Sequence, residues 1–357
     1  MSDTFFTIQS IPAEGTIDLL KKNTIGTPGY SMVYQHAEVE NKMKAIEDPY
    51  YVALKRNNEI IGTCCFCSRD TINRGEKIPA FYLRYVTFKA LYRSNPQMQP
   101  RRKNKESRLR TEMVRLLSGE GLGAGAQHTF FQYAYVDPLN HRSAALCKEF
   151  AFEQVRTCST LIFNRLNPKQ NSRVEKLSLA ELPQIKEKLE SFYKDYTMFS
   201  FENIFRVGAY YVIRNHEGNI IVGVQVNPDR WKILEMPGIT GKMLLNTFSF
   251  LPVLNRLIKK DYRFITLEGI YFSPGNEKAL ETLFESVLAI YSRNSAMLWL
   301  DTGSDLYNRI KSLRLGMVHS LSKEVTAGVI CRFTGFKEEQ REMFKNSPAY
   351  ISGIDIT

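Results

Sequence analysis

The chain has 357 residues, a length that predicts two domains, and its formal net charge is +11. With 43% hydrophobic and 24% charged residues, the composition is typical of a globular protein and excludes a largely disordered chain. No apolar run reaches the length of a membrane-spanning helix. The N-terminus MSDTFFTIQS lacks the features of a secretory signal, so we expect a cytoplasmic protein.

The net charge and the cysteines leave several classes of binding partner open. A basic chain can bind nucleic acid, an anionic membrane surface, an acidic protein or a phosphorylated cofactor, and charge alone does not choose among these. The six cysteines have no metal-site spacing, so we expect free thiols in a reducing compartment and no metal cofactor. They are Cys64, Cys65 and Cys67 within one expected strand, and Cys147, Cys158 and Cys331 elsewhere.

The first half begins with two expected helices and continues with extended segments. Residues 56–59 form a polar turn between two apolar runs, which is typical of a β-hairpin. The stretch 103–117 has a basic face and an apolar stripe, as in an amphipathic helix. In chain order we expect helices at 15–22 and 35–46, strands at 50–55, 60–66 and 78–88, a helix at 103–117, and a glycine-rich connector at 119–125.

The stretch 130–155 organises this half. Residues 130–136 are aromatic and apolar, which predicts a buried strand. Asp137 and Pro138 end that strand, and Asn140 can cap a following helix because its side-chain oxygen accepts from an unpaired first-turn amide. The helix should run to about Phe150, and residues 157–163 should form the next strand.

The second half repeats this order. The run Tyr210–Arg214 echoes Tyr50 and its neighbours, and the turn and strand after it are echoed too. A shared order at an offset of about 160 residues indicates an internal duplication. After a linker near residue 167, we expect a helix at 179–196, strands at 210–214, 219–223 and 231–236, a helix at 244–259, a strand at 264–272, a helix at 277–291, a strand at 296–300, a helix at 304–315 and a strand at 325–333.

The unit formed by the strand, Asn140, the helix and the pair Ala151–Phe152 resembles the late part of the GCN5-related N-acetyltransferase (GNAT) fold, written roughly N-x-x-A-x-x-L-Y-x-K-x-G-F. The spacing fits, but Cys147 stands where the family usually has tyrosine and Ala151 where it has glycine. The resemblance and the duplication together imply an α/β chain with a mixed sheet and two tandem GNAT-like domains, at 1–166 and 174–357.

In that family, acetyl-CoA or another acyl-CoA lies between the fourth and fifth strands, with its pyrophosphate on backbone amides at a helix start, where N–H groups and the helix dipole favour an anion. The basic run 101–109, at the start of the expected helix 103–117, matches this place, although Asn104 and Glu106 replace glycines. A solvated basic face is the competing interpretation. The donor-binding residues that the resemblance implies are Val86, Phe88, Arg101, Arg102, Lys103, Asn104, Lys105 and Asn140. Lys278 is the weaker counterpart in the second half.

Acyl transfer to an amine needs a group that takes a proton from the amine and one that protonates the leaving thiolate. Glu268 lies inside an apolar strand, so it is a candidate general base or else a solvent-facing strand residue. Cys147 occupies the position of the family's tyrosine. We expect it to contribute little to the rate, because a buried structural cysteine is commoner than a catalytic one.

The resemblance therefore implies an acyltransferase that moves an acetyl or longer acyl group from acyl-CoA to an amine of a small molecule or peptide. An alternative donor is an acyl chain on an acidic acyl carrier protein, which would suit the positive charge. The non-enzymatic alternative is a degenerate GNAT scaffold that binds an acidic partner; nucleic acid is the less favoured partner.

Overall fold

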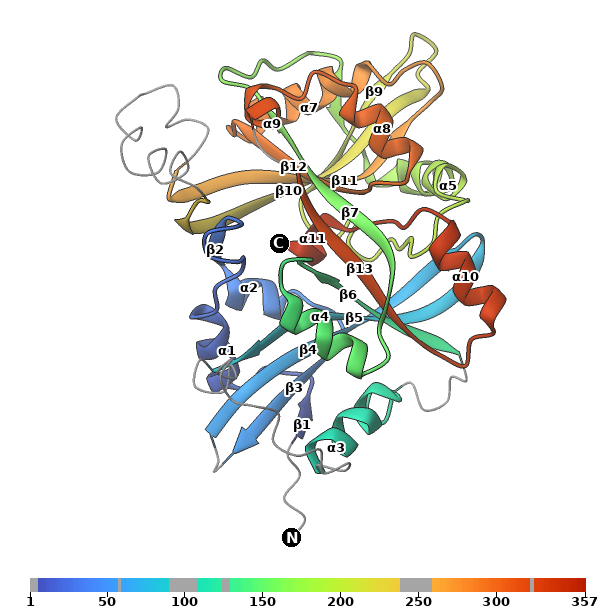
Figure 1. The fold of residues 1–357 in the computed structure, drawn as a ribbon. Helices are drawn as coiled ribbons and strands as arrows, with labels where there is room; N and C mark the ends of the chain where they lie inside the picture. Colours follow the sequence, from blue (N-terminus) through green and yellow to red (C-terminus); the bar gives the residue numbers. More distant parts are fainter. Residues whose placement is uncertain (1–5, 57–58, 90–107, 124–128, 238–258, 322–323) are drawn as a thin grey trace.

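A mixed β-sheet runs through the whole molecule in the computed structural model, which describes residues 6–56, 59–89, 108–123, 129–237, 259–321 and 324–357 (Figure 1). Helices lie against both faces of the sheet, and the first half of the chain occupies the lower part of the view while the second occupies the upper part. The alternation of strands and helices expected from the sequence is confirmed.

The first half supplies one end of the sheet and an N-terminal arm, which comprises α1, β2 and α2 (residues 14–44). Its strands β3 to β6 are neighbours in the order of the chain, and β1 adds to the edge. The elements are β1 (Phe6–Gln9), α1 (Glu14–Lys21), β2 (Val33–His36), α2 (Val39–Lys44), β3 (Pro49–Arg56), β4 (Glu59–Asn73), β5 (Glu76–Phe88), α3 (Arg108–Leu117), β6 (Phe130–Val136), α4 (His141–Glu149) and β7 (Glu153–Asn164).

The second half repeats the arrangement from the opposite end of the sheet. Strands β9 to β12 are again neighbours, and β8 lies at the edge. The elements are β8 (Val174–Lys176), the 3-10 helix η3 (Leu179–Glu181), α5 (Leu182–Phe192), β9 (Ala209–Arg214), β10 (Ile220–Glu235), β11 (Asp261–Phe272), α7 (Ala279–Ile290), β12 (Ser295–Asp301), α8 (Asp305–Lys311), α9 (Met317–Leu321), β13 (Val325–Thr334), α10 (Glu338–Asn346) and α11 (Gly353–Ile356).

The two halves exchange their last strands at the centre of the sheet, where the order is β6-β13-β7-β12. Strand β13, from the second half, pairs with β6 from Gly328 to Thr334. Strand β7, from the first half, pairs from Cys158 to Asn164 with the whole of β12. The two exchanged strands also pair with each other. The boundary expected between residues 166 and 174 therefore separates the two repeats in sequence, but the sheet contains strands from both repeats in alternation at its centre.

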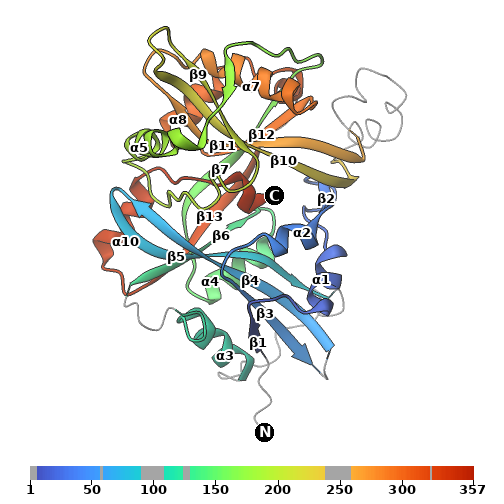
Figure 2. The same ribbon diagram turned by 180° about the vertical axis from the view of Figure 1, so that it is seen from behind.

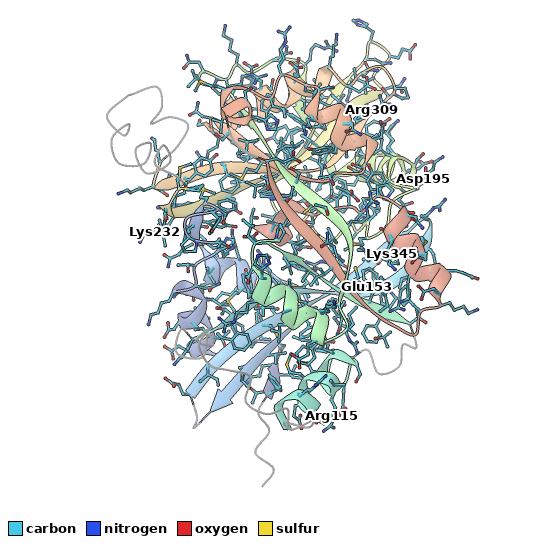
Figure 3. The ribbon with its side chains drawn as sticks, viewed as in Figure 1. Arg115, Glu153, Asp195, Lys232, Arg309 and Lys345 are labelled. Atoms are coloured by element: carbon cyan, nitrogen blue, oxygen red, sulfur yellow. The ribbon has the colours of Figure 1, made fainter. Side chains whose placement is uncertain are left out.

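Contacts outside the sheet reinforce this exchange. Helix α10, which follows β13, ion-pairs with β7 through Lys345 Nζ and Glu153 Oε2 at 3.3 Å; both residues are labelled in Figure 3. On the other side of the molecule, β2 leaves the N-terminal arm and pairs with β10 (Figure 2). Helix α11 then brings the chain to the middle of the molecule, between the two halves.

Strand β6 and the cap at Asn140 lie where the sequence places them: β6 is Phe130–Val136, and Asn140 Oδ1 accepts from the Ser143 amide at 3.1 Å. The duplicated motifs also correspond, since Tyr50 lies on β3 and Tyr210 on β9, each the strand next to a long hairpin partner. Helix α3 (Arg108–Leu117) ends at Leu117, where the basic helix was expected to end. The start of that expected helix, at residues 103–107, lies outside the described residues.

Three expectations were wrong. The helix expected at 304–315 ends at Lys311. Residues 35–46 were expected to be one helix, but Gln35 and His36 belong to β2, because β10 offers them a strand partner that local sequence cannot show. Residues 231–235 are not a separate strand; they continue β10, which pairs with β11 from Val222 to Lys232 and with β2 from Trp231 to Glu235. The expected helix at 244–259 falls almost wholly outside the described residues.

Candidate active site

Each half contains a pair of parallel strands that separate after a short stretch of pairing. In the first half, β5 pairs with β6 only from Ala80 to Tyr82, and β5 then continues to Phe88 paired with β4 alone. In the second half, β11 pairs with β12 only at Ile265 and Thr266. Parallel strands that diverge in this way leave backbone groups without partners and open a wedge between the two strands.

A β-bulge interrupts the long strand of each wedge at the same place. In the ladder of β4 and β5 the register shifts opposite Cys64, so that Tyr85 and Val86 face one residue, and Tyr85 has a φ of 59°. In the ladder of β10 and β11 the register shifts next to Glu268, and Gly269 has a φ of 55°. A bulge leaves one residue outside the ladder and is common beside active sites.

Arg84 and Glu268 therefore occupy equivalent positions. Each lies two residues beyond the last pair with the diverging parallel strand and directly before the left-handed residue of the bulge. Both side chains are buried, at 7% and 3% exposure. The duplication thus places an arginine and a glutamic acid at the same point of the two wedges, a difference that separates the chemistry of the two halves.

The wedge of the second half is filled by the chain itself. The bulge amide of Gly269 donates to Tyr350 Oη at 3.1 Å, and Ser352 Oγ donates to Glu268 Oε2 at 2.6 Å. Gly353 packs so closely against Trp299 that an added Cβ would lie 3.3 Å from its ring. The cavity left between β11 and β12 measures only ≈ 10 Å³, less than a single water molecule needs.

The wedge of the first half remains open on one face of β5. A cavity of ≈ 150 Å³ lies against the bulge and is bounded by the N-terminal arm and by α11. Arg84 donates to the carbonyl oxygen of Thr357 at its inner end. The cavity is lined by Leu20, Asn23, Ile25, His36, Val39, Tyr82, Arg84, Tyr85, Val86, Asp355 and Ile356.

On the other side of the wedge, α4 has no buried residue, which is unusual for a helix beside a core strand. Helices α3 and α4 approach each other there, with Arg110 Nη1 3.6 Å from Glu149 Oε1. Large apolar side chains on β5, on α3, before α4 and on α4 are exposed: Val86, Val114, Leu139 and Leu146, at 52%, 46%, 46% and 42%.

The two predicted catalytic residues do not share a site. Glu268 lies in the filled wedge of the second half, where Asn227 Nδ2 also donates to it at 2.9 Å. Burial, followed by the nearby Asp355 carboxylate, raises the pKa of Glu268 to about 8, although the Ser352 hydrogen bond opposes the rise. Cys147 is half-buried on α4 against the apolar core, and burial raises its pKa, so its thiol stays protonated.

The predicted donor-binding residues fall into two groups. Val86 and Phe88 lie on the end of β5 beyond its pairing with β6, and Val86 lines the cavity. Asn140 caps α4. The residues Arg101, Arg102, Lys103, Asn104 and Lys105 lie outside the described residues, and their role stays a prediction. In the second half, Lys278 precedes α7.

Sequence reasoning missed His36, Arg84 and Asp355. These come from β2, β5 and α11, which are far apart in the chain, so no local spacing connects them. One signal was present: Arg84 interrupts an otherwise apolar and aromatic strand, and a cation in such a run needs a reason. Within the part of the chain that the structure describes, no group of three or more His, Cys, Asp or Glu side chains is arranged to hold a metal.

A duplicated sheet with a bulged, diverging strand pair in each half defines a tandem GNAT-fold protein. The sequence matches no protein-family model and no curated protein. The similarity appears in solved structures. N-myristoyltransferase of Saccharomyces cerevisiae with bound myristoyl-CoA superposes with a TM-score of 0.57 at 11% identity, over 99% of this chain and 88% of that one.

Two further solved structures agree. Another structure of the yeast N-myristoyltransferase, with myristoyl-CoA and inhibitors, has a TM-score of 0.58 at 12% identity and covers 97% and 86% of the two chains. A probable N-acyltransferase from Enterococcus faecalis has a TM-score of 0.50 at 12% identity and covers 93% and 73%. The chain therefore has the two-domain GNAT fold of the N-myristoyltransferase type. No described helix is long and apolar enough to cross a lipid bilayer.

Proposed function

We propose that the chain is an N-acyltransferase that transfers an acyl group from an acyl-CoA to an amine, and that the first half alone carries the reaction. One contrast supports this proposal: the bulge amide of the second half is already bound by Tyr350, whereas the bulge of the first half adjoins a cavity of ≈ 150 Å³. A donor that occupied the second wedge would first have to displace residues 349–353.

The first half has the features that an acyl-CoA requires. Beyond Tyr82, the edge of β5 that faces β6 offers backbone amides to an acyl carbonyl or a pantetheine amide, because β6 has diverged from it. The exposed apolar side chains between β5, α3 and α4 offer contact to an aliphatic chain. The donor supplies the activated thioester, and the residues of this chain would bind and orient it. Attack of the uncharged amine would form the C–N bond and break the C–S bond, and the CoA thiolate would take up the proton that the amine nitrogen loses.

The reaction would use both sides of β5. The donor would lie along the wedge toward α4, and the amine would approach from the cavity between the N-terminal arm and α11. The bulge at Tyr85 and Val86 separates the two sides, so amide groups there would be positioned to stabilise negative charge on the carbonyl oxygen during attack. Arg84, buried behind the bulge, adds positive potential at the same point.

The proposal is tested by calorimetry with CoA and acyl-CoAs. A carboxylate introduced at the open wedge, as Val86→Glu or Leu146→Glu, should weaken binding more than about tenfold through loss of apolar contact and repulsion of phosphate. Leu179→Glu, at an 84% exposed side chain of the second half, should bind like the wild type. A wild-type chain that binds no CoA compound would point instead to the non-catalytic scaffold, and acyl carrier protein serves as a separate donor arm.

A further inference from the structure

Helix α3 ends on a contact from the other half of the chain. The carbonyl oxygens in the last turn of a helix have no partner within the helix, so other groups must bind them. Local backbone amides bind the oxygens of Val114 and Leu116, at 2.9 and 3.0 Å. The oxygen of Leu117 instead accepts from Arg332 Nη1, which lies 215 residues further along the chain.

Arg332 belongs to the exchanged strand β13. It lies opposite Gln132 of β6 in the ladder that joins the two halves, and Figure 1 shows β13 running from the upper half of the molecule into the lower half. The same Nη1 atom also donates to Thr334 Oγ1 of its own strand at 3.1 Å, which fixes the direction of the side chain. The second half of the chain therefore reaches α3 through one oriented guanidinium group.

The surroundings of Arg332 give this contact a second purpose. The side chain is half-buried, burial lowers the pKa of Arg332, and no charge among the described residues opposes that shift. A cation that loses water without a carboxylate partner costs free energy unless another group compensates it. The C-terminal end of a helix carries a partial negative charge on its carbonyl oxygens, so the end of α3 can compensate the guanidinium. The contact therefore accounts for an arginine in the middle of the sheet.

The position of one end of α3 determines the position of the other. The helix has 10 residues, so it is about 15 Å long, and a tilt of about 10° at its last turn would move its first turn by roughly 2.6 Å, nearly the length of a hydrogen bond. That first turn has no acidic residue and is where the donor phosphates are predicted to lie. The side chains of Leu116 and Leu117 hold α3 on the apolar core, but apolar contact is non-directional. The hydrogen bond from Arg332 is directional and fixes the angle of the helix.

We propose that Arg332 is a positioning residue for the acyl donor, because it holds α3 at the angle at which the first turn of the helix meets the donor phosphates. The inference rests on the proposed function and adds a residue of the second half to donor binding in the first half. Arg332 does not touch the donor; it acts through Leu117 and the helix. Loss of its hydrogen bond should therefore weaken binding of the phosphates and leave binding of the rest of the donor unchanged.

The test compares CoA with pantetheine, which lacks all the phosphates, by calorimetry on the full chain. Arg332→Met removes the guanidinium group and keeps an apolar stem, so it should weaken CoA binding about tenfold and leave pantetheine binding unchanged. Arg332→Lys keeps a cation and a donor, so it should recover most of the CoA affinity. An equal loss for both ligands would mean a purely structural role and would overturn the proposal, as would wild-type CoA affinity in Arg332→Met.

Arg309→Met is the matched control. Arg309, labelled in Figure 3, lies on α8 of the second half, where it is exposed and its Nε is 2.6 Å from Asp305 Oδ2. The change removes the same unit of positive charge at a place remote from α3, so CoA affinity should equal that of the wild type. A loss as large as that of Arg332→Met would make net charge the cause, rather than the angle of the helix, and would overturn the proposal.

Hydrogen exchange in the wild type gives the answer if Arg332→Met does not fold or if pantetheine binds too weakly to measure. Coupling between two sites is reciprocal, so CoA should slow exchange at residues 114–117, next to the contact with Arg332, as well as in the first turn of α3. Slowing that is confined to the first turn would show that the two ends of the helix are not coupled, and would overturn the proposal.

The two proposals can be told apart when they fail. If CoA binds equally to the wild type and to Arg332→Met, the positioning role is refuted and the donor assignment stands. If the wild type binds no CoA compound, the proposed acyl transfer is refuted and the positioning role with it.

Discussion

Ala151 adopts a left-handed conformation, with a φ of 61°, directly after α4. Gly316 occupies the corresponding place in the repeated sequence, with a φ of 111°, but lies five residues beyond the end of α8 at Lys311. A residue with a Cβ is strained in this region, whereas glycine is not. The left-handed position after α4 is thus occupied by a residue type that is strained there.

Ala151→Gly should raise the free energy of unfolding by roughly 0.5–1 kcal/mol, since relief of strain exceeds the added entropy of the unfolded chain. Gly316→Ala is the matched control and should lower it by about 2 kcal/mol or more, because its Cβ would lie 2.4 Å from the Asn164 carbonyl oxygen. Urea unfolding measures both. A less stable Ala151→Gly variant would contradict the strain.

Glu268 gives the stability of the fold a pH dependence. Its pKa is about 8 when folded and about 4.3 when unfolded, so the folded chain binds one more proton between these values. Stability from this group is therefore full below about pH 4 and is lost as the pH rises to about 8.

Glu268→Gln should remove this loss, which is of the order of a few kcal/mol. The amide keeps an acceptor for Asn227 and can donate to Ser352, so the fold should be preserved. Urea midpoints at pH 5 and pH 8 should differ less in the variant than in the wild type. Equal differences would mean that another group causes the pH dependence, and a lost acyl-transfer activity would favour the base role instead.

At the scale of elements, α11 is a short helix held by a buried ion pair. Arg69 Nη2 of β4 lies 2.8 Å from Asp355 Oδ1, and both side chains are at most 5% exposed. Tyr133 and Asn203 also donate to this carboxylate. The helix therefore depends on contacts to both halves.

Asp355→Asn should lower the free energy of unfolding by about 3 kcal/mol, because it leaves the Arg69 cation buried without its charge partner. The double variant Arg69→Met with Asp355→Asn should recover part of this loss, since the unpaired cation is then gone. Additive losses in the double-mutant cycle would show that the pair is not coupled. Denaturant unfolding of all four chains gives the coupling energy.

Elements with strong local signals were predictable from the sequence, and those made by distant pairing were not. Residues 130–136 and the Asn140 cap carry their own pattern, so β6 and α4 were found to within a residue. His36 was assigned to a helix because its strand partner, Trp231, lies far along the chain. Glu268 was singled out as unusual, but its partner Ser352 is remote, so the closed wedge could not be foreseen.

At the scale of the whole molecule, neither half completes its own sheet. Strand β6 needs β13, and β12 needs β7, so the exchanged strands bury edges that a separated half would expose. Arg156 of β7 adds a buried ion pair to Asp301 of β12 at 2.7 Å. The two halves repeat the same order of elements, but we expect them to unfold together as one cooperative unit.

Expressed alone, residues 1–166 or 174–357 should be insoluble or lack cooperative unfolding, whereas co-expressed fragments should associate into a CoA-binding complex. Size-exclusion chromatography and thermal unfolding measure this. A soluble first fragment with a sharp unfolding transition would show that the exchange is dispensable.

The exchange of β13 also delays completion of the sheet during synthesis. Roughly 170 residues separate the end of β7 from the end of β13, which is roughly ten to thirty seconds of translation at typical rates. Throughout that interval the facing edges of β6 and β7 have been made but their shared partner has not. Such edges invite pairing with other nascent chains, so productive folding of this protein requires that something, such as a chaperone or transient non-native pairing, shields them on the ribosome until the last strand arrives.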